Sequence, residues 1–271
     1  MMFSYDSSKN EFLTKDTIRE IAPSVFTEKA DSSSTSKHYV HIPTENVIDD
    51  MASLGWGVVD AKQVNARKNA GYQKHMVVFG NDDITITGKD GDTVMPRILM
   101  TNSHDGKNAF TFTAGLFRMI CENGLVVADT KFEDFKVKHM GYDFETLQDT
   151  IKEIISNLDL TVVSMNKMKE TELNEEQMFN LAKSVLAMRV EGTNNTYNKD
   201  AITEVLDPQR SEDVGNGLWE VFNRVQENIM EGNFEYLTVK GKPRQARIIK
   251  NFKQDQDLNK KMFSKALEFV A

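Results

Sequence analysis

Cysteine is almost missing from this chain, which has a single cysteine, Cys121, among its 271 residues. One thiol excludes an internal disulfide and any zinc site built from several cysteines, in agreement with a reducing compartment. Because Cys121 lies in an apolar run, we expect it to pack in the interior rather than to react.

Long apolar runs are missing as well. No stretch reaches the roughly 18 apolar residues that a membrane-spanning helix needs. The first residues, MMFSYDSSKNEF, lack the basic start and the apolar stretch of a secretion signal. We therefore expect a cytoplasmic protein with no membrane partner. Its hydrophobic fraction of 39% is still large enough to form a core.

The sequence lacks the common nucleotide and metal motifs. No glycine is followed by the Gly-Lys-Ser/Thr pattern of a phosphate-binding loop. His38 and His41 point to opposite faces of an expected strand, and His75, His104 and His139 have no neighbouring ligand at zinc spacing. We therefore predict neither a metal nor a cofactor and expect these histidines on the surface or in turns. A two-metal nuclease site made of carboxylates from distant segments is a separate possibility.

Three segments of different pattern divide the chain. Residues 1–37 are irregular apart from a short helix expected at 15–22, and the serine-rich stretch 31–37 indicates a flexible N-terminal arm. Residues 38–142 contain runs rich in β-branched and aromatic residues, separated by turn sequences, which predict an antiparallel sheet core. Residues 143–271 repeat apolar positions every three or four residues, which indicates helices packed on or beside the sheet. We therefore predict an α+β fold, an antiparallel meander with helices on one face followed by a helical C-terminal half.

Charge gives the main functional indication. The formal net charge is −8, so any site for an anion has to be local. Two segments are nevertheless basic and free of acidic residues, one within residues 61–75 and one within residues 240–254. The second contains Gly241 and Pro243 and is expected to run from a loop into a helix on which Arg247 and Lys250 share a face. Such a segment suits phosphate oxygens, whereas a solvated surface beside acidic neighbours is the alternative explanation.

Aromatic residues lie near both basic segments. Trp56 and Tyr72 are close to the first, and Phe234, Tyr236 and Phe252 are close to the second. A basic groove lined by aromatic rings suits single-stranded nucleic acid, because bases stack on the rings while phosphates follow the charge. Burial in the core is the alternative for each ring. The predicted nucleic-acid-binding residues are Lys62, Arg67, Lys68, Lys74, Trp56, Tyr72, Lys107, Lys242, Arg244, Arg247 and Lys250.

One short segment contains three side chains of catalytic type, Ser103, His104 and Asp105. Adjacent residues of an extended chain point to opposite faces, so these three cannot form a catalytic triad among themselves without an unusual turn. A hairpin turn with Asp105 and Gly106 at its tip accounts for the sequence. The alternative is a loop whose backbone amides and Lys107 bind an anion.

The region 100–125 resembles a protein family that is spread through phages and plasmids. This family is catalogued as domain of unknown function nine-three-two. The family pattern is a Ser-His-Asp-Gly turn, a strand and an Arg-x-x-Cys-x-Asn-Gly/Thr-Leu segment, here residues 103–106 and 118–125. Residues 218–223 and 257–263 are also similar to its C-terminal part, with Phe263 where a tryptophan is often found. The resemblance covers residues from about 40 to 270 and implies a mobile genetic element. It attaches no role to the motif residues, which are Ser103, His104, Asp105, Gly106, Arg118 and Asn123.

A second resemblance concerns the order of elements. A helix, the sequence Leu54-Gly55-Trp56-Gly57, a long basic strand and a meander backed by helices are similar to the core of single-strand annealing recombinases of the Rad, Erf and Red beta type. Those proteins assemble into rings or filaments and hold a DNA strand in a basic groove without ATP. The resemblance implies single-stranded DNA as a partner and a homo-oligomer.

Three functional hypotheses follow. The first is a phage- or plasmid-encoded protein that binds and anneals single-stranded DNA in recombination or replication without ATP. The second is an interaction protein that binds and inhibits a host protein, such as a defence component, with its acidic surface as a nucleic-acid mimic. The third is a hydrolase or nuclease centred on Ser103, His104, Asp105 and Cys121. We favour the first, and with it binding rather than catalysis.

Overall fold

The computed structural model describes residues 12–65, 70–84, 86–87, 93–118, 135–137, 143–190, 193–249 and 251–270. The chain divides into two compact units, with the boundary between Leu158 and Asp159. This boundary lies inside a long helix rather than at residue 142, where the sheet core was expected to end. None of the helices in the described ranges is both long and apolar enough to span a bilayer.

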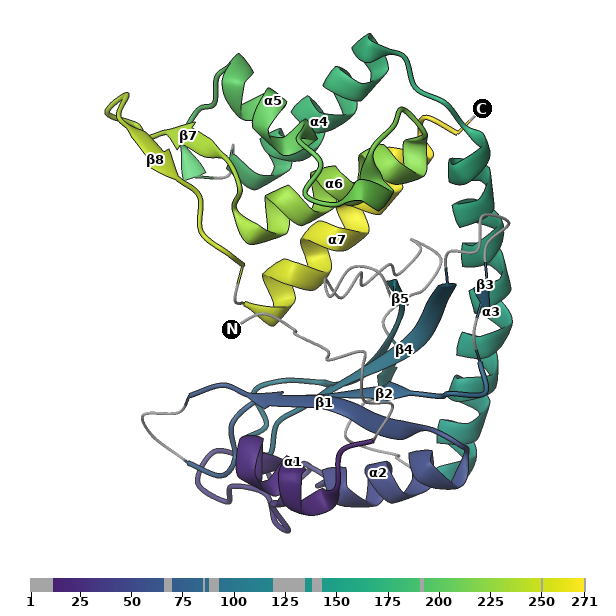
Figure 1. Cartoon of the computed structure of the whole chain (residues 1–271). Helices are drawn as coiled ribbons and strands as arrows, with labels where there is room; N and C mark the ends of the chain where they lie inside the picture. Colours follow the sequence, from purple (N-terminus) through teal and green to yellow (C-terminus); the bar gives the residue numbers. More distant parts are fainter. Residues whose placement is uncertain are drawn as a thin grey trace. The chain divides into compact units, whose positions relative to one another are not determined.

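The first unit, here called the sheet unit, is built on one antiparallel sheet (Figure 1). The strands follow the order β1-β2-β4-β5-β6, and the short β3 pairs with β4. The predicted antiparallel meander is confirmed, with the one difference that β4 lies beside β2 because β3 is short. The strands are β1 (Gly57–Gln63), β2 (His75–Gly80), β3 (Ile86–Thr87), β4 (Thr93–Asn102), β5 (Phe110–Arg118) and β6 (Phe135–Val137).

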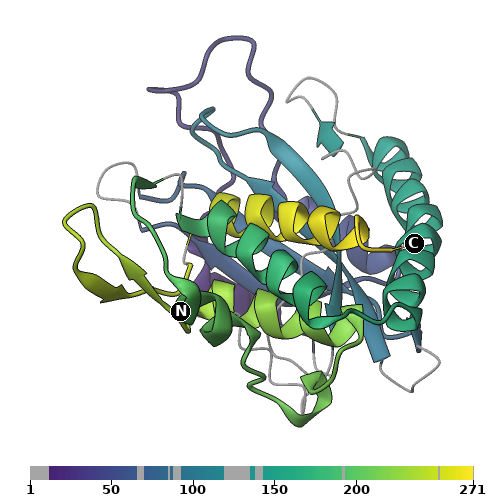
Figure 2. The same ribbon diagram turned by 90° about the horizontal axis from the view of Figure 1, so that it is seen from above.

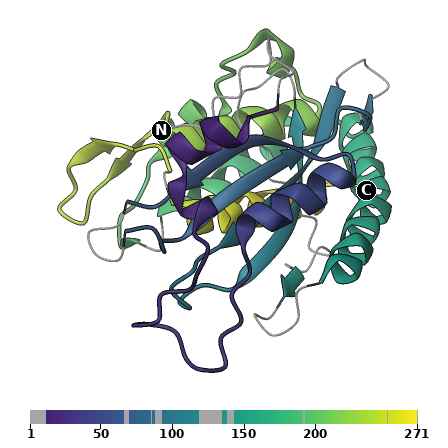
Figure 3. The same ribbon diagram turned by 90° about the horizontal axis from the view of Figure 1, so that it is seen from below.

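Helices and sheet share one hydrophobic core in this unit. Seen from below in Figure 3, α1 and α2 cross the same face of the sheet. Because alternate residues of a strand point to one face, Val77 and Phe79 of β2 meet the helices together. The core also contains Met51 of α2 and Ile151 of the long helix. The helices are α1 (Lys15–Ile21), the 3-10 helix η1 (Pro23–Phe26), α2 (Thr44–Ser53) and α3 (Phe144–Glu170), whose first part belongs here.

The N-terminal segment differs from the flexible arm that was expected at 1–37. Across its described residues, 12–37, Ile18, Ala22 and Val25 form an apolar stripe buried in the core. The serine-rich part is a turn instead of a linker, because the backbone amide and the hydroxyl group of Ser33 both donate to the Asp31 carboxylate. Side-chain hydrogen bonds of this kind replace the backbone partners that a linker would leave to water.

The second unit, here called the helical unit, confirms the predicted helical C-terminal half. Figure 2 shows its helices from above and, at one side, a hairpin that the sequence did not predict. The elements are the end of α3, α4 (Glu175–Val190), α5 (Lys199–Leu206), the 3-10 helix η3 (Ser211–Asp213), α6 (Leu218–Glu231), β7 (Glu235–Leu237), β8 (Pro243–Gln245) and α7 (Phe252–Leu267).

Helix α6 is the central element of the helical unit and packs against α4, α5 and α7. Its apolar face carries Trp219 and Phe222, both 1% exposed. Its buried polar side chains have partners, as buried polar groups require. The Asn228 amide donates to three carbonyl groups at the end of α5, and Gln226 donates to Asn259 of α7 at 3.0 Å. These bonds fix the angle at which α5 and α7 meet α6.

His75 lies in the core of the sheet unit, although it was expected on the surface or in a turn. Its Nδ1 is 3.1 Å from the Gln73 carbonyl oxygen, which only accepts, so Nδ1 carries the proton. Nε2 therefore accepts from the Thr44 hydroxyl at 2.8 Å, and that hydroxyl accepts from the Asn102 amide at 3.0 Å. This buried polar chain joins the start of α2 to β2 and β4. Burial lowers the pKa of His75 to about 4.

Removing a buried methyl-rich side chain from the N-terminal segment tests whether it belongs to the fold. Ile18 and Ile21 lie in the same helix but are 1% and 45% exposed. We expect Ile18→Ala to lower the free energy of unfolding in urea by about 3 kcal/mol, because a cavity remains in the core. Ile21→Ala should lower it by less than about 1 kcal/mol. Equal small losses would mean that the segment contributes nothing to stability.

Acid should destabilise the protein through His75. The unfolded imidazole titrates near 6.5, whereas the folded one titrates at about 4, so the unfolded state binds more protons between these values. The contribution of neutral His75 is complete above pH 6.5 and is lost as the pH falls toward 4. From about pH 7.5 to about pH 5 we expect urea unfolding to show a loss of roughly 2 kcal/mol from this residue.

The matched variants are His75→Gln, which has no titrating imidazole in the core, and His38→Gln, which changes an exposed histidine. His75→Gln should show a clearly smaller loss between the two pH values, and His38→Gln should keep the full loss. An undiminished loss in His75→Gln would assign the acid sensitivity to other groups.

Candidate functional site

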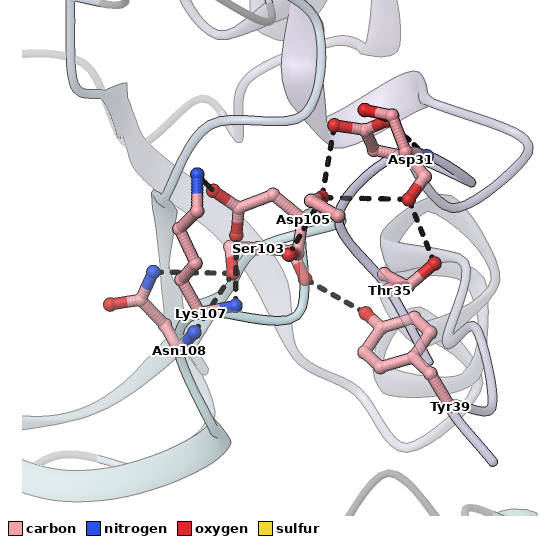
Figure 4. A network of polar contacts seen from close by, with 9 residues as sticks. Asp31, Thr35, Tyr39, Ser103, Asp105, Lys107 and Asn108 are labelled. Atoms are coloured by element: carbon pink, nitrogen blue, oxygen red, sulfur yellow. Dashed lines mark hydrogen bonds and ion pairs between the residues drawn. The ribbon is translucent and has the colours of Figure 1, made fainter. Parts of the chain in front are cut away.

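The predicted turn after β4 is confirmed as a hairpin connection, in which Gly106 has a φ of 71°. Figure 4 shows that its backbone holds the N-terminal segment. The Tyr39 hydroxyl donates to the Ser103 carbonyl and the Ser34 hydroxyl to the Asp105 carbonyl, both at 3.0 Å. Desolvation and the Asp105 charge raise the pKa of Tyr39 to about 12, so its hydroxyl stays a donor. The turn therefore acts as a structural connection between two segments.

The side chains of this turn have separate partners. The Ser103 hydroxyl accepts from the backbone and the amide of Asn108, both at 3.2 Å. Asp105 accepts from the Lys107 backbone at 3.1 Å, and the Lys107 ammonium lies 3.5 Å from its carboxylate. This arrangement gives a nucleophile no adjacent base and leaves Lys107 beside an acidic group. It supports neither the hydrolase hypothesis nor an anion-binding loop.

His104 lies in the predicted turn, but its ring is buried and not on the surface. Its centroid lies 4.6 Å from that of His41 and 5.0 Å from that of His75. Within the described ranges, no three histidine, cysteine or carboxylate side chains are placed to hold a metal ion. Among the other motif residues, Arg118 ends β5, whereas Cys121 and Asn123 lie outside the described residues.

The first basic segment does not form a groove in the part that the structure describes. Trp56 is 1% exposed in the core, because the chain turns inward after α2, and it cannot stack on a ligand as predicted. The Lys62 ammonium lies 3.4 Å from Asp60, a neighbour just outside the acid-free segment. Tyr72 and Lys74 are half-buried. The remaining predicted residues of this segment, Arg67 and Lys68, lie outside the described residues.

The second basic segment, in contrast, lines a pocket of about 270 Å³ in the helical unit, here called the arginine pocket. Arg244 and Arg247 come from this segment, and Arg189 comes from the last turn of α4. Lys242 is exposed in the hairpin turn, and Lys250 lies outside the described residues. The full lining is Arg189, Val190, Thr193, Asn195, Phe234, Tyr236, Arg244, Ala246 and Arg247.

The pocket depends on the β7–β8 hairpin, where a loop running into a helix was expected. Residues 243–245 pair with 235–237, and α7 begins only at Phe252, so Arg247 is not helical and shares no helix face with Lys250. Tyr236 is directly opposite Arg244 in the register, which places both on one face. Phe234 and Ala246, two residues away on each side, face the same way.

A close backbone approach fixes the base of this hairpin. Gly232 ends α6 with a φ of 82°, a conformation that favours glycine. A Cβ at this position would lie 2.8 Å from the Ala246 carbonyl carbon. The Ala246 amide continues the pairing by donating to Phe234 at 2.9 Å. The chain that carries Arg247 therefore passes directly over the end of α6.

Arg189 is the residue that sequence reasoning missed. Its only local signal is a basic side chain in the last turn of a helix, which the helix dipole explains equally well. Its Nη2 donates to the Arg247 carbonyl at 2.9 Å, and its buried Nε has no hydrogen-bond partner among the described residues. Burial lowers the pKa of Arg189 and the nearby Tyr236 opposes this, but an arginine remains charged at neutral pH.

The guanidinium groups of Arg244 and Arg247 are also available to bind an anion. Both side chains are exposed, and neither forms an ion pair with a residue in the described part of the chain. Planar guanidinium groups bind phosphate or carboxylate oxygens through paired donors. The pocket can therefore hold an anion next to an aromatic wall.

Comparison with known proteins gives a family but no activity. Two proteins of Escherichia coli (strain K12), UPF0380 protein YafZ and UPF0380 protein YfjQ, are each 28% identical to this chain over 253 residues. Each alignment covers 93% of this chain and 89% of the relative. No solved structure matches. The model of the family described as Domain of unknown function (DUF932) matches residues 32–263, and the chain therefore belongs to this family.

Proposed function

We propose that this protein binds single-stranded DNA through the arginine pocket. The observation that carries the proposal is the meeting of Arg189, Arg244 and Arg247 beside Tyr236, from segments far apart in the sequence. Guanidinium groups supply the affinity for phosphates, and an accessible ring supplies a surface on which a base can stack. Single strands offer both groups at once, whereas the bases of a duplex are already stacked.

The charge balance of the chain strengthens this argument. Acidic residues number 41 against 33 lysines and arginines, so a local group of arginines stands out against an acidic chain. Arg244 and Arg247 are exposed without such a partner among the described residues. Like charges that converge without a counterion repel each other, and a bound anion removes this cost. An external polyanion is therefore the natural counterion.

The turn of the hairpin extends the basic surface. Lys240 and Lys242 are exposed there, and Val239 between them and β7 is 72% exposed. Gly241 closes the turn with a φ of 69°. Lysines at this turn add a salt-dependent, sequence-independent attraction to phosphates. Lys242 is only two residues before Arg244 in the chain. The site is thus a local basic region on an acidic protein.

Annealing of complementary strands and assembly into a homo-oligomer belong to the same proposal. Annealing without ATP requires that most bases of a bound strand stay accessible, which a small local site permits because it contacts only part of the strand. A phage or plasmid setting in recombination or replication follows from the family resemblance. Mass photometry of the purified protein with and without DNA would detect the oligomer.

The test is fluorescence anisotropy of a labelled single-stranded oligonucleotide at about 50 mM and about 200 mM salt. We expect Arg244→Ala/Arg247→Ala to weaken binding by about tenfold or more. Loss of two phosphate contacts should also reduce the slope of log affinity against log salt by about 1.4.

The control is Lys167→Ala/Lys261→Ala, which removes the same charge from exposed positions of the helical unit outside the pocket lining. This variant should bind nearly as the unaltered protein does, and thermal unfolding should confirm that both variants fold. Equal weakening by the two variants, or no binding of the unaltered protein at low salt, would refute the proposal. The host-protein hypothesis would then be tested by stoichiometric capture of a defined host protein.

A further inference from the structure

We infer that the arginine pocket holds one nucleotide, with its phosphate on Arg244 and Arg247 and its base against Tyr236. This inference deepens the proposed function and rests on it. The pocket volume of about 270 Å³ is just below the roughly 300 to 1,000 Å³ that is usual for small-ligand pockets. A pocket of this size indicates that one nucleotide is inserted, instead of a strand lying across a flat surface.

One wall of the pocket is aromatic. Phe234, directly before β7, is 2% exposed and tightly packed, and the half-buried Tyr236 lies two residues further along the chain, inside β7. The two side chains face the same way, since strand residues alternate between faces. Arg244 is opposite Tyr236 in the register, so a planar base that stacks on the ring lies next to a guanidinium group.

One arginine of the charged wall, Arg189, is already positioned before a ligand arrives. The bond from the Arg189 guanidinium to the Arg247 carbonyl fixes both the side chain of the first residue and the backbone of the second. The Nε of Arg189, which has no hydrogen-bond partner among the described residues, is a further donor. A donor held in place in advance binds a phosphate with little loss of side-chain entropy. Arg244 and Arg247 then close on the remaining phosphate oxygens.

A third wall offers a neutral polar group. The Asn195 amide donates to the Thr193 hydroxyl at 2.6 Å, and that hydroxyl donates to the Val190 carbonyl at 2.6 Å. These bonds set the orientation of the Asn195 side chain. Its Oδ1 accepts no hydrogen bond within the described residues and is free to bind a polar edge of a base. Phosphate, ring and base edge thus each have a group of matching chemistry.

The test is isothermal titration calorimetry of the full chain with deoxyadenosine monophosphate, deoxyadenosine and inorganic phosphate. The monophosphate should bind about tenfold or more tightly than either fragment, because it engages the charged wall and the aromatic wall together. It should also displace a labelled single-stranded oligonucleotide. Equal affinity for phosphate and monophosphate would reduce the pocket to a plain anion site and overturn the inference.

Variants distinguish the contribution of the aromatic wall from that of the charged wall. Tyr236→Leu should weaken monophosphate binding by about tenfold while leaving phosphate binding unchanged, and Tyr236→Phe, which keeps the ring, should restore it. Arg244→Ala should weaken both ligands. Equal weakening of both ligands by Tyr236→Leu would indicate a structural role for the ring and would contradict the inference.

The outcomes distinguish this inference from the proposed function. Oligonucleotide binding that depends on Arg244 and Arg247, without any binding of the monophosphate, would leave the proposed function intact and refute the one-nucleotide pocket. Monophosphate binding without oligonucleotide binding would do the reverse and assign the pocket to free nucleotides.

Discussion

Buried polar groups at the end of β4 determine how the sheet unit is assembled. The chain from Asn102 through Thr44 to His75 fixes the start of α2 between β4 and β2. The carbonyl groups that follow, at Ser103 and Asp105, accept from Tyr39 and Ser34 and hold the N-terminal segment. Burying any of these polar groups without its hydrogen-bond partner would cost free energy. The segments therefore stabilise the fold only when all of them are in place. The Ser-His-Asp-Gly turn of the family pattern lies at this junction, which gives this turn a structural role.

The architecture was predictable because it depends on periodicity. Alternation and turn residues revealed the antiparallel sheet, and apolar spacing revealed the C-terminal helices. The β7–β8 hairpin was not predictable, because its strands are three residues long and show no alternation. The burial of the Trp56 ring was not predictable, because a single aromatic residue in a sequence can be either buried or exposed. In the structure it packs in the core.

The candidate site was predictable only in part for a related reason. Arg244 and Arg247 stand out as a local excess of positive charge in an acidic chain. Arg189 is an ordinary helix residue whose relevance arises from tertiary contact with Arg247 alone. Charge runs therefore locate one side of such a site, and long-range packing supplies the other. The same limit explains why the burial of His75 and His104 was not predicted.

The end of α6 has a consequence for how the pocket can vary. Gly232 leaves a space that the backbone at Ala246 fills, so the two chain segments touch where a side chain would otherwise stand. Any larger residue there would push aside the strand that leads to Arg247. The position of Arg247 thus depends on the absence of a Cβ atom at Gly232, a residue outside the pocket lining. A substitution of Gly232 would therefore shift the backbone at Arg247 without changing any residue of the pocket lining.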